Sequence, residues 1–152
     1  MGGNSSYSAE WGGVPEAQRS HIDTNYKVDG HKVLLQKNNN EQTKNILNSN
    51  SDSPIYLIAK TDKDGCIQIE SINVFDGHNL SYEINLVFDK NGNIVPFNGA
   101  KGTHAHQWSL NSETGLLERK SHDSKNIFAV DKKYDALIAK IVEFNKKQKK
   151  IK

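Results

Sequence analysis

Four short apolar runs, separated by turn residues, occupy the middle of the chain. The runs cover residues 55–60, 66–75, 80–88 and 93–97. The dipeptides between them are Asp64-Gly65, Asp76-Gly77 and Asn91-Gly92. Apolar runs joined by Asp-Gly or Asn-Gly are typical of consecutive β-hairpins. The pattern therefore predicts an antiparallel β-meander.

The third run alternates strictly between apolar and polar side chains. Its apolar members occupy every second position: Leu80, Tyr82, Ile84, Leu86 and Phe88. We expect this face to pack on the core, and the face that carries Glu83 and Asn85 to contact water. In the second run the apolar phase changes by one residue near Ser71, which predicts a β-bulge there.

The N-terminal third of the chain predicts less regular structure. Residues 1–20 are rich in Gly, Ser and Asn and show no apolar period, which is typical of a mobile N-terminal arm. Residues 30–36 predict a short strand. The three asparagines at 38–40 are each suited to cap a short N-terminal helix that ends near Leu47. A polar loop is expected over residues 48–54.

Two elements are predicted after the meander. Residues 103–110 and 116–122 predict a further hairpin. The chain then predicts an amphipathic helix from about residue 131 to residue 145, because apolar side chains recur there at helical spacing and Asp131 is a suitable cap. We therefore expect a single α+β domain over residues 21–145, in which the C-terminal helix packs on one face of the meander.

Composition supports one small domain. The chain has 152 residues, of which 35% are hydrophobic, and its mean hydropathy is -0.73, so we expect a thin core and long polar loops. Residues 146–152 form a basic tail with five lysines, and their removal changes the net charge from +2 to -3. A slightly acidic body differs from proteins that coat nucleic acid, where basic residues cover a face.

Cellular location is predicted from absent features of the sequence. The single Cys66 has no partner for an internal disulfide, which is typical of a reducing compartment. No apolar stretch approaches the roughly 18 residues that span a bilayer. The first twenty residues also lack the apolar centre of a signal peptide. We expect a cytoplasmic protein with no membrane partner, and the sequence leaves its oligomeric state open.

Three histidines gather in the predicted hairpin that follows the meander. If residues 104–110 form a strand, the period of two puts His104, His106 and Trp108 on one face. In one hairpin register, His106 lies opposite Lys120, and His104 lies opposite a third histidine, His122. Each imidazole then lies close to a cation or to another imidazole.

A second register and two further residues extend this cluster. When the hairpin pairing slips by one residue, Arg119 lies opposite Trp108. Lys101 precedes the first strand of the hairpin, and His21 is available from the N-terminal segment. Either register therefore brings fixed cations close to the imidazoles.

Three interpretations of the cluster are open. In metal-independent RNA cleavage, one neutral imidazole takes the proton of a 2′-hydroxyl and a protonated one donates to the leaving 5′-oxygen, while a cation stabilises the charge on the phosphate. Alternatively, a His-x-His pair and a third ligand such as Asp123 hold zinc. In the third interpretation the imidazoles are structural and have polar partners within the hairpin.

Two short motifs resemble those of a nuclease group. Residues 20–26, Ser-His-Ile-Asp-Thr-Asn-Tyr, resemble the early histidine motif of the phage and polymorphic-toxin nucleases of the barnase, EndoU, colicin and RelE type. Gly102-Thr103-His104 resembles their later Gly-Thr-His. The chain is also similar to small prophage-encoded proteins of Gram-positive bacteria. The resemblance implies catalytic roles for His21 and His104, on a small antiparallel sheet that follows an N-terminal helical part. Unlike that pattern, the chain has a long central meander, and His106-Gln107-Trp108 where apolar residues and proline are usual.

Our leading hypothesis is a phage- or mobile-element-encoded, metal-independent ribonuclease without a cofactor, whose partner is RNA. The residues expected to carry catalysis are His104, His21, His106 and Lys120. The residues expected to contact substrate are Arg119, His122, Lys101 and Trp108. The alternative is a non-enzymatic phage protein that binds and inhibits a host defence protein through its polar sheet face. A protein with a histidine-bound metal is the third hypothesis.

Overall fold

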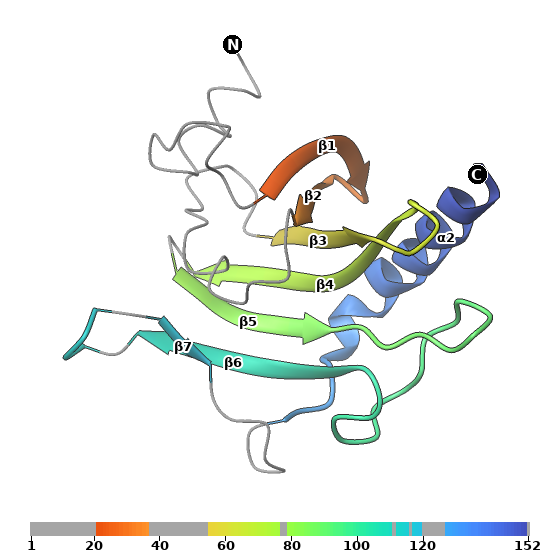
Figure 1. Cartoon of the computed structure of the whole chain (residues 1–152). Coiled ribbons are helices and arrows are strands. Elements are labelled where there is room, and N and C mark those ends of the chain that lie inside the picture. The colour runs from red at the N-terminus through yellow and green to blue at the C-terminus, as the bar shows by residue number, and fades with distance from the viewer. Residues whose placement is uncertain are drawn as a thin grey trace.

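The computed structural model describes residues 21–36, 55–76, 79–110, 112–115, 117–119 and 127–151. Within these residues, seven strands form one sheet in chain order, and a C-terminal helix packs on it (Figure 1). The strands are β1 (His21–Val28), β2 (His31–Gln36), β3 (Ile55–Thr61), β4 (Ile67–Asp76), β5 (Asn79–Asn85), β6 (His104–Leu110) and β7 (Leu117–Arg119). The helical elements are a 3-10 turn, η3 (Lys132–Tyr134), and α2 (Asp135–Ile151).

The pairing of the strands confirms the predicted α+β class and meander order. All neighbouring strands pair antiparallel except β2 and β3, which are parallel. A parallel pair needs a crossover connection longer than a hairpin turn. The expected N-terminal helix belongs to that connection, and, like the arm expected over residues 1–20, it lies outside the described residues.

Two of the predicted hairpin turns have the same construction. In each, an aspartate side chain accepts hydrogen bonds from the backbone N–H groups two and four residues later, at 2.8 to 3.0 Å. The first turn begins at Asp62 and has Gly65 at φ 84°, and the second begins at Asp89 and has Gly92 at φ 83°. Aspartate thus organises each turn locally, and glycine accepts the left-handed conformation that each turn requires.

Residues 93–97 do not form the strand that the fourth apolar run predicted. A single bridge joins Phe88 to Ile94, and the Val95 N–H donates to the Val87 carbonyl at 2.8 Å. Pro96 then has no N–H to continue a ladder. The chain turns back instead, so that the Thr103 N–H donates to the Val95 carbonyl at 3.0 Å.

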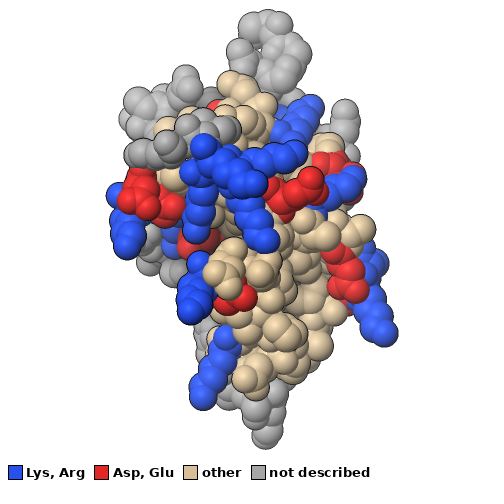
Figure 2. Space-filling model, turned by 90° about the vertical axis from the view of Figure 1, so that its right-hand side faces the viewer, with Lys and Arg blue, Asp and Glu red and all other residues tan. Residues whose placement is uncertain are grey.

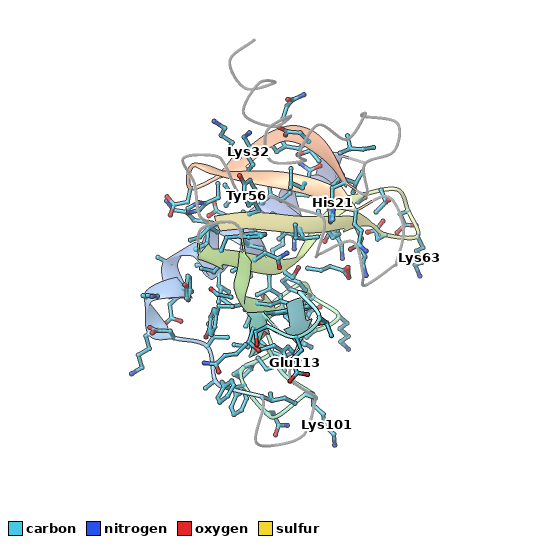
Figure 3. The ribbon with its side chains drawn as sticks, turned by 90° about the vertical axis from the view of Figure 1, so that its left-hand side faces the viewer. His21, Lys32, Tyr56, Lys63, Lys101 and Glu113 are labelled. Atoms are coloured by element: carbon cyan, nitrogen blue, oxygen red, sulfur yellow. The ribbon has the colours of Figure 1, made fainter. Side chains whose placement is uncertain are left out.

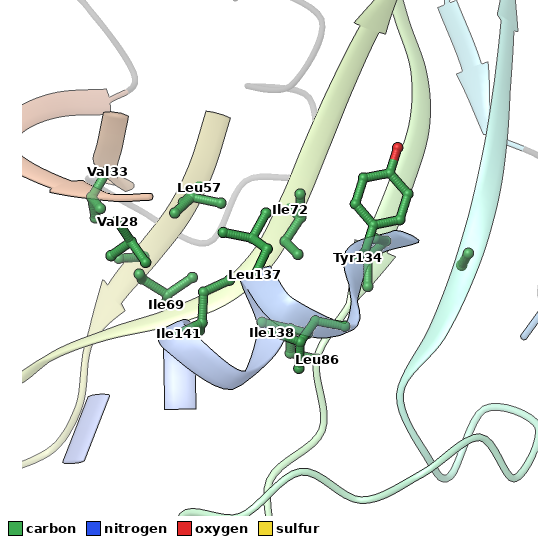
Figure 4. Close-up of a cluster of buried hydrophobic side chains, with 13 residues drawn as sticks. Val28, Val33, Leu57, Ile69, Ile72, Leu86, Tyr134, Leu137, Ile138 and Ile141 are labelled. Atoms are coloured by element: carbon green, nitrogen blue, oxygen red, sulfur yellow. The ribbon is translucent and has the colours of Figure 1, made fainter. Parts of the chain in front are cut away.

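One face of the sheet packs on α2 and forms the hydrophobic core (Figure 4). Its buried strand residues include Val33, Leu57, Ile69, Ile72, Ile84 and Leu86, and its buried helix residues include Leu137, Ile138 and Ile141. Tyr82 and Phe88 are partly buried against this cluster. The apolar face predicted for the third run is therefore confirmed over residues 82–88.

The helix is longer than the sequence pattern predicted. Asp131 caps its first turn, as expected, by accepting a hydrogen bond from the Lys133 N–H at 3.0 Å. The helix then continues through the basic tail to Ile151. Lysine favours helix, and Lys147 lies 3.8 Å from the carboxylate of Glu143, one turn earlier. Lysine side chains consequently gather over the C-terminal part of α2 (Figure 2).

A side chain from the helix closes a β-bulge in β4. The β3–β4 register shifts by one residue at Glu70, which confirms the bulge predicted near Ser71. The amide of Asn145 accepts a hydrogen bond from the Ile69 N–H at 2.8 Å and donates one to the Ile69 carbonyl at 3.0 Å. Asn145 is only 3% exposed. The helix is therefore fixed to the sheet at the point where the ladder is interrupted.

Replacement of Asn145 by alanine should lower the free energy of unfolding by about 2–4 kcal/mol, because the N–H and carbonyl of Ile69 would both be left buried without that partner. Gln148→Ala, on a more accessible part of the same helix, is the matched control and should change stability by less than about 1 kcal/mol. Urea unfolding curves measure both variants. Equal midpoints for the two would show that Asn145 does not anchor the helix.

Candidate active site

The sheet face opposite α2 carries a row of polar residues in direct register. Cross-strand pairing runs from Lys32 on β2 through Tyr56 and Asn73 to Glu83 on β5 and His106 on β6. Their neighbours along each strand belong to the helix-facing core, so the period of two puts this row on the other face. All but Lys32 are at most 1% exposed. Such a concentration of buried polar groups is costly unless they are paired, and is typical of functional sites.

The burial of Glu83 corrects one prediction. We expected the polar face of the third run to contact water, yet Glu83 is 0% exposed. The indole Nε1–H of Trp108 donates to its Oε1 at 2.9 Å. The physical reason is that β5 is a central strand, so that β4 and β6 place Asn73 and His106 directly beside Glu83.

The ring of His104 has defined contacts at both nitrogens. Its Nδ1 lies 2.7 Å from the carbonyl oxygen of Gly102, and its Nε2 lies 3.5 Å from Nδ2 of Asn85. A carbonyl oxygen only accepts, so Nδ1 carries a proton, and in the neutral ring Nε2 holds the lone pair. This tautomer is the one that a general base acting at Nε2 requires.

His106 lies next to both His104 and Glu83. The two ring centroids are 4.8 Å apart, with an interplanar angle of 80°. His106 is also directly opposite Glu83, and the Cβ atoms of such antiparallel pairs lie about 5 Å apart. The cluster therefore places two imidazoles and one carboxylate side by side on the polar face.

The residues before His104 explain how the strand that carries it begins. A Cβ atom on Gly102 would lie 1.9 Å from the carbonyl oxygen of Pro96, so only glycine fits there without a shift of the backbone. Thr103 is buried, and its hydroxyl accepts a hydrogen bond from the Val87 N–H at 3.0 Å. Gly102 thus permits the backbone of residue 102 to approach that of Pro96 closely, and the Thr103 hydrogen bond joins the start of β6 to the segment after β5. These two contacts hold His104 on the polar face.

The structure brings His104 together with His106 but not with His21. His21 is buried on β1, where it pairs with Gln36 of β2. Strands β1 and β6 are separated by five inter-strand spacings, which is about 24 Å along the sheet. Figure 3 shows His21 in the upper part of the sheet and Lys101 at the bottom of the molecule.

Three of the other predicted site residues, Trp108, Arg119 and Lys101, lie within the described part of the chain. Trp108 is half-buried on β6 and bonds to Glu83. Arg119 pairs with Trp108 along the backbone, so the hairpin has the second of the two registers considered. Lys101 is exposed in the turn before β6. Lys120 and His122 lie outside the described residues.

A cavity of about 210 Å³ lies on the sheet, and one of its lining residues, Asn85, contacts His104. Its other lining residues are Gln36, Ile58, Lys60, Glu70, Ser71 and Leu86. A larger cavity of about 510 Å³, lined by residues such as Phe97 and Ile138, is mainly apolar. Among the described residues, neither cavity is lined by any of the predicted site residues.

The sequence interpretation missed several members of this face. Glu83 and Asn85 were taken to be the solvent-facing half of the third run, and Tyr56 and Asn73 were not singled out. The available signal was their shared phase, since each alternates with residues of the helix-facing core. Which of them lie side by side depends on strand register, however, and register is not a local property of sequence.

Searches for similar proteins and for metal-binding geometry gave no match. No protein-family model, curated protein or solved structure matches the chain. In the part of the chain that the structure describes, no three His, Cys, Asp or Glu side chains are grouped so as to hold a metal ion. No helix in that part is long and apolar enough to cross a membrane. The geometry of the polar face is therefore the basis for assigning a function to the chain.

Proposed function

We propose that the chain is a metal-independent ribonuclease whose reactive groups lie on the polar face of its sheet. The observation that carries this proposal is the contact of His104 with His106, at 4.8 Å between ring centroids, beside the buried carboxylate of Glu83. Two imidazoles in different environments are suited to act as base and acid in one reaction near neutral pH.

The proposed reaction assigns one proton transfer to each imidazole. Nε2 of His104 takes the proton of a ribose 2′-hydroxyl, and the 2′-oxygen attacks the adjacent phosphorus. The bond from phosphorus to the 5′-oxygen breaks, and protonated His106 donates its proton to that oxygen. The products are a 2′,3′-cyclic phosphate and a 5′-hydroxyl end. Glu83 acts as a positioning residue, directly opposite His106 on the neighbouring strand.

Two further residues support an RNA substrate. Arg119 lies on β7, in backbone register with Trp108, and arginine is a residue type that stabilises charge on a phosphate. The half-buried indole of Trp108 is suited to stack on a base. The expected roles of Lys120 and His122 stay predictions. His106 takes the place that the toxin resemblance gave to His21, because β1 lies at the opposite side of the sheet from β6.

Burial bears on both hypotheses, because RNA must also reach His104 and His106, which are 5% and 0% exposed. The alternative hypothesis, a non-enzymatic inhibitor of a host defence protein, requires an accessible polar sheet face. Glu83 and His106 are both 0% exposed. Desolvated, pre-positioned polar groups strengthen electrostatic catalysis. An origin in a phage or mobile element is part of the proposal through the resemblance alone.

Incubation of the purified protein with total RNA, with and without EDTA, tests this proposal. We expect cleavage that EDTA leaves unchanged and that a parallel preparation of His104→Ala lacks. Loss of cleavage on chelation would instead support the metal hypothesis. Absence of cleavage under all conditions would contradict the ribonuclease and favour the inhibitor.

A further inference from the structure

The segment between β5 and β6 contains two Asn-Gly pairs with different surroundings. They are Asn91-Gly92 and Asn98-Gly99, and the sequence has no other Asn-Gly pair. In such a pair the backbone nitrogen of glycine can attack the side-chain amide carbon of asparagine, because glycine has no Cβ to obstruct the approach. Whether a given pair reacts therefore depends on how firmly the structure holds that nitrogen.

The first pair is held by its own turn and by the helix. The Gly92 N–H donates to the Asp89 carbonyl at 3.0 Å, and the Asp89 side chain accepts from the Asn91 N–H at 2.8 Å. Lys146 of α2 covers the turn, because its side-chain carbons lie 3.6 Å from the position of a Cβ on Gly92 and its Nζ donates to Oδ1 of Asn93 at 2.6 Å. Attack by the Gly92 nitrogen would therefore require the loss of a backbone hydrogen bond.

The second pair lacks these restraints. Asn98 and Gly99 are both exposed. Within the described part of the chain, the Gly99 N–H donates no hydrogen bond, and no atom beyond the neighbouring residues lies within 4 Å of a Cβ on Gly99. The hydrogen bonds of this turn use carbonyl groups instead: the Lys101 N–H donates to the Asn98 carbonyl at 3.2 Å, and the Gly102 N–H donates to the Gly99 carbonyl at 3.4 Å. The attacking nitrogen is therefore accessible.

We infer that Asn98 is a site of spontaneous deamidation and that Asn91 is protected from the same reaction. The Gly99 nitrogen loses its proton and bonds to Cγ of Asn98, whose NH₂ group takes up a proton and leaves as ammonia. A water molecule then opens the resulting cyclic succinimide at either of its carbonyls. The products have aspartate or isoaspartate at residue 98. The reaction is independent of the proposed ribonuclease function.

Either product changes the turn that leads into β6. Both add a negative charge. In isoaspartate the main chain runs through the side-chain carbons, so the carbonyl that accepts from Lys101 becomes part of a free carboxylate. The turn is closely packed at this point, because a Cβ on Gly102 would lie 2.8 Å from the Asn98 nitrogen. Isoaspartate formation would therefore remove a hydrogen bond at the start of the strand that carries His104.

Incubation of the native protein in mildly alkaline buffer, followed by digestion and mass spectrometry, tests this assignment. Cleavage after lysine releases residues 91–101 as one peptide, so fragment ions measure both pairs in the same sample. Deamidation should be about five-fold or more faster at Asn98 than at Asn91, the factor that corresponds to one backbone hydrogen bond of ordinary strength. In concentrated urea, where the structure is lost, the two rates should become similar.

Variants of two equivalent turns test the cause of the protection. Asp89→Ala removes the side-chain acceptor that organises the first turn, so it should raise the rate at Asn91 towards that at Asn98 and leave the rate at Asn98 unchanged. Asp62→Ala is the matched control, because Asp62 organises the other turn in the same way, and it should change neither rate. If Asp89→Ala unfolds, Lys146→Ala uncovers the same turn and should also raise the rate at Asn91.

Several results would overturn the inference. Deamidation of the native protein that is as fast at Asn91 as at Asn98, or that is absent at Asn98, would contradict the assignment. An equally large difference between the two rates in urea would show that sequence, and not structure, causes it. A rate at Asn91 that neither Asp89→Ala nor Lys146→Ala changes would show that the turn does not protect this residue.

Discussion

His104→Ala should reduce the rate of RNA cleavage by about 100-fold or more, the usual scale for the loss of a general acid or base. The same loss of rate is expected for His106→Ala, because each imidazole carries out one of the two proton transfers of the reaction. Both variants should keep a cooperative melting transition. His31→Ala, on β2 and outside the cluster, is the matched control and should retain full activity.

A structural role for these histidines predicts the reverse result. His104→Ala would then lower the free energy of unfolding by about 1–3 kcal/mol, because it would remove the partner of the Gly102 carbonyl, and the folded fraction would keep its activity. Measurement of melting and of RNA cleavage on the same sample separates the two. A destabilised but fully active His104→Ala protein would end the catalytic assignment.

Glu83→Gln gives a third variant. Glutamine is close in size and keeps an oxygen that can accept the Trp108 indole bond, so the fold should be preserved. Loss of the carboxylate removes a charged group directly opposite His106. If Glu83 positions His106, cleavage should slow by up to about 100-fold, the scale expected when a catalytic group is displaced by about 1 Å. An unchanged rate in a normally folded variant would show that Glu83 does not position the acid.

Gly102→Ala should lower the free energy of unfolding by about 3 kcal/mol, one of the largest effects expected for a change this small. The added Cβ would meet the Pro96 carbonyl oxygen at 1.9 Å and the Asn98 nitrogen at 2.8 Å, and neither backbone atom can move alone. Because the Gly102 carbonyl accepts from His104, displacement of this residue should also slow cleavage by the folded fraction.

Gly99→Ala is the matched control for Gly102→Ala. No atom lies within 4 Å of the position of its Cβ, and only its φ of 56° is unfavourable for alanine. That conformation costs about 1–2 kcal/mol. Urea unfolding should therefore rank wild type above Gly99→Ala and Gly99→Ala above Gly102→Ala. Similar stabilities for the two variants would show that the close approach at Gly102 can relax.

Features set by neighbouring residues were predictable from the sequence. The Asp-Gly and Asn-Gly turns, the bulge near Ser71, the cap at Asp131 and the apolar face of residues 82–88 each depend on local conformation or on a short period. Strand β1 was missed, because Asn25 has a left-handed φ of 67° and the β1–β2 register shifts beside it. The interruption hides the period of two on which strand prediction depends.

The candidate site was predictable only within one strand. His104, His106 and Trp108 share a face because β6 is regular, so their proximity followed from sequence spacing. The pairing of His106 with Glu83 joins two strands that are connected by residues 86–103, and no tight turn fixes the register across so long a connection. The burial of Glu83 also depends on neighbouring strands. Sequence therefore identified the imidazoles but not the carboxylate beside them.

Analysis of the product ends tests the central claim most directly. A short oligoribonucleotide, and a matched oligonucleotide of the same sequence in which every ribose is replaced by 2′-deoxyribose, should be incubated with the protein in EDTA and analysed by mass spectrometry. A metal-independent ribonuclease of this kind should cleave the first, with a 2′,3′-cyclic phosphate and a 5′-hydroxyl end, and should not cleave the second, which lacks the attacking oxygen. Cleavage of the deoxyoligonucleotide, products with 5′-phosphate ends, or no cleavage of either substrate would contradict the proposal.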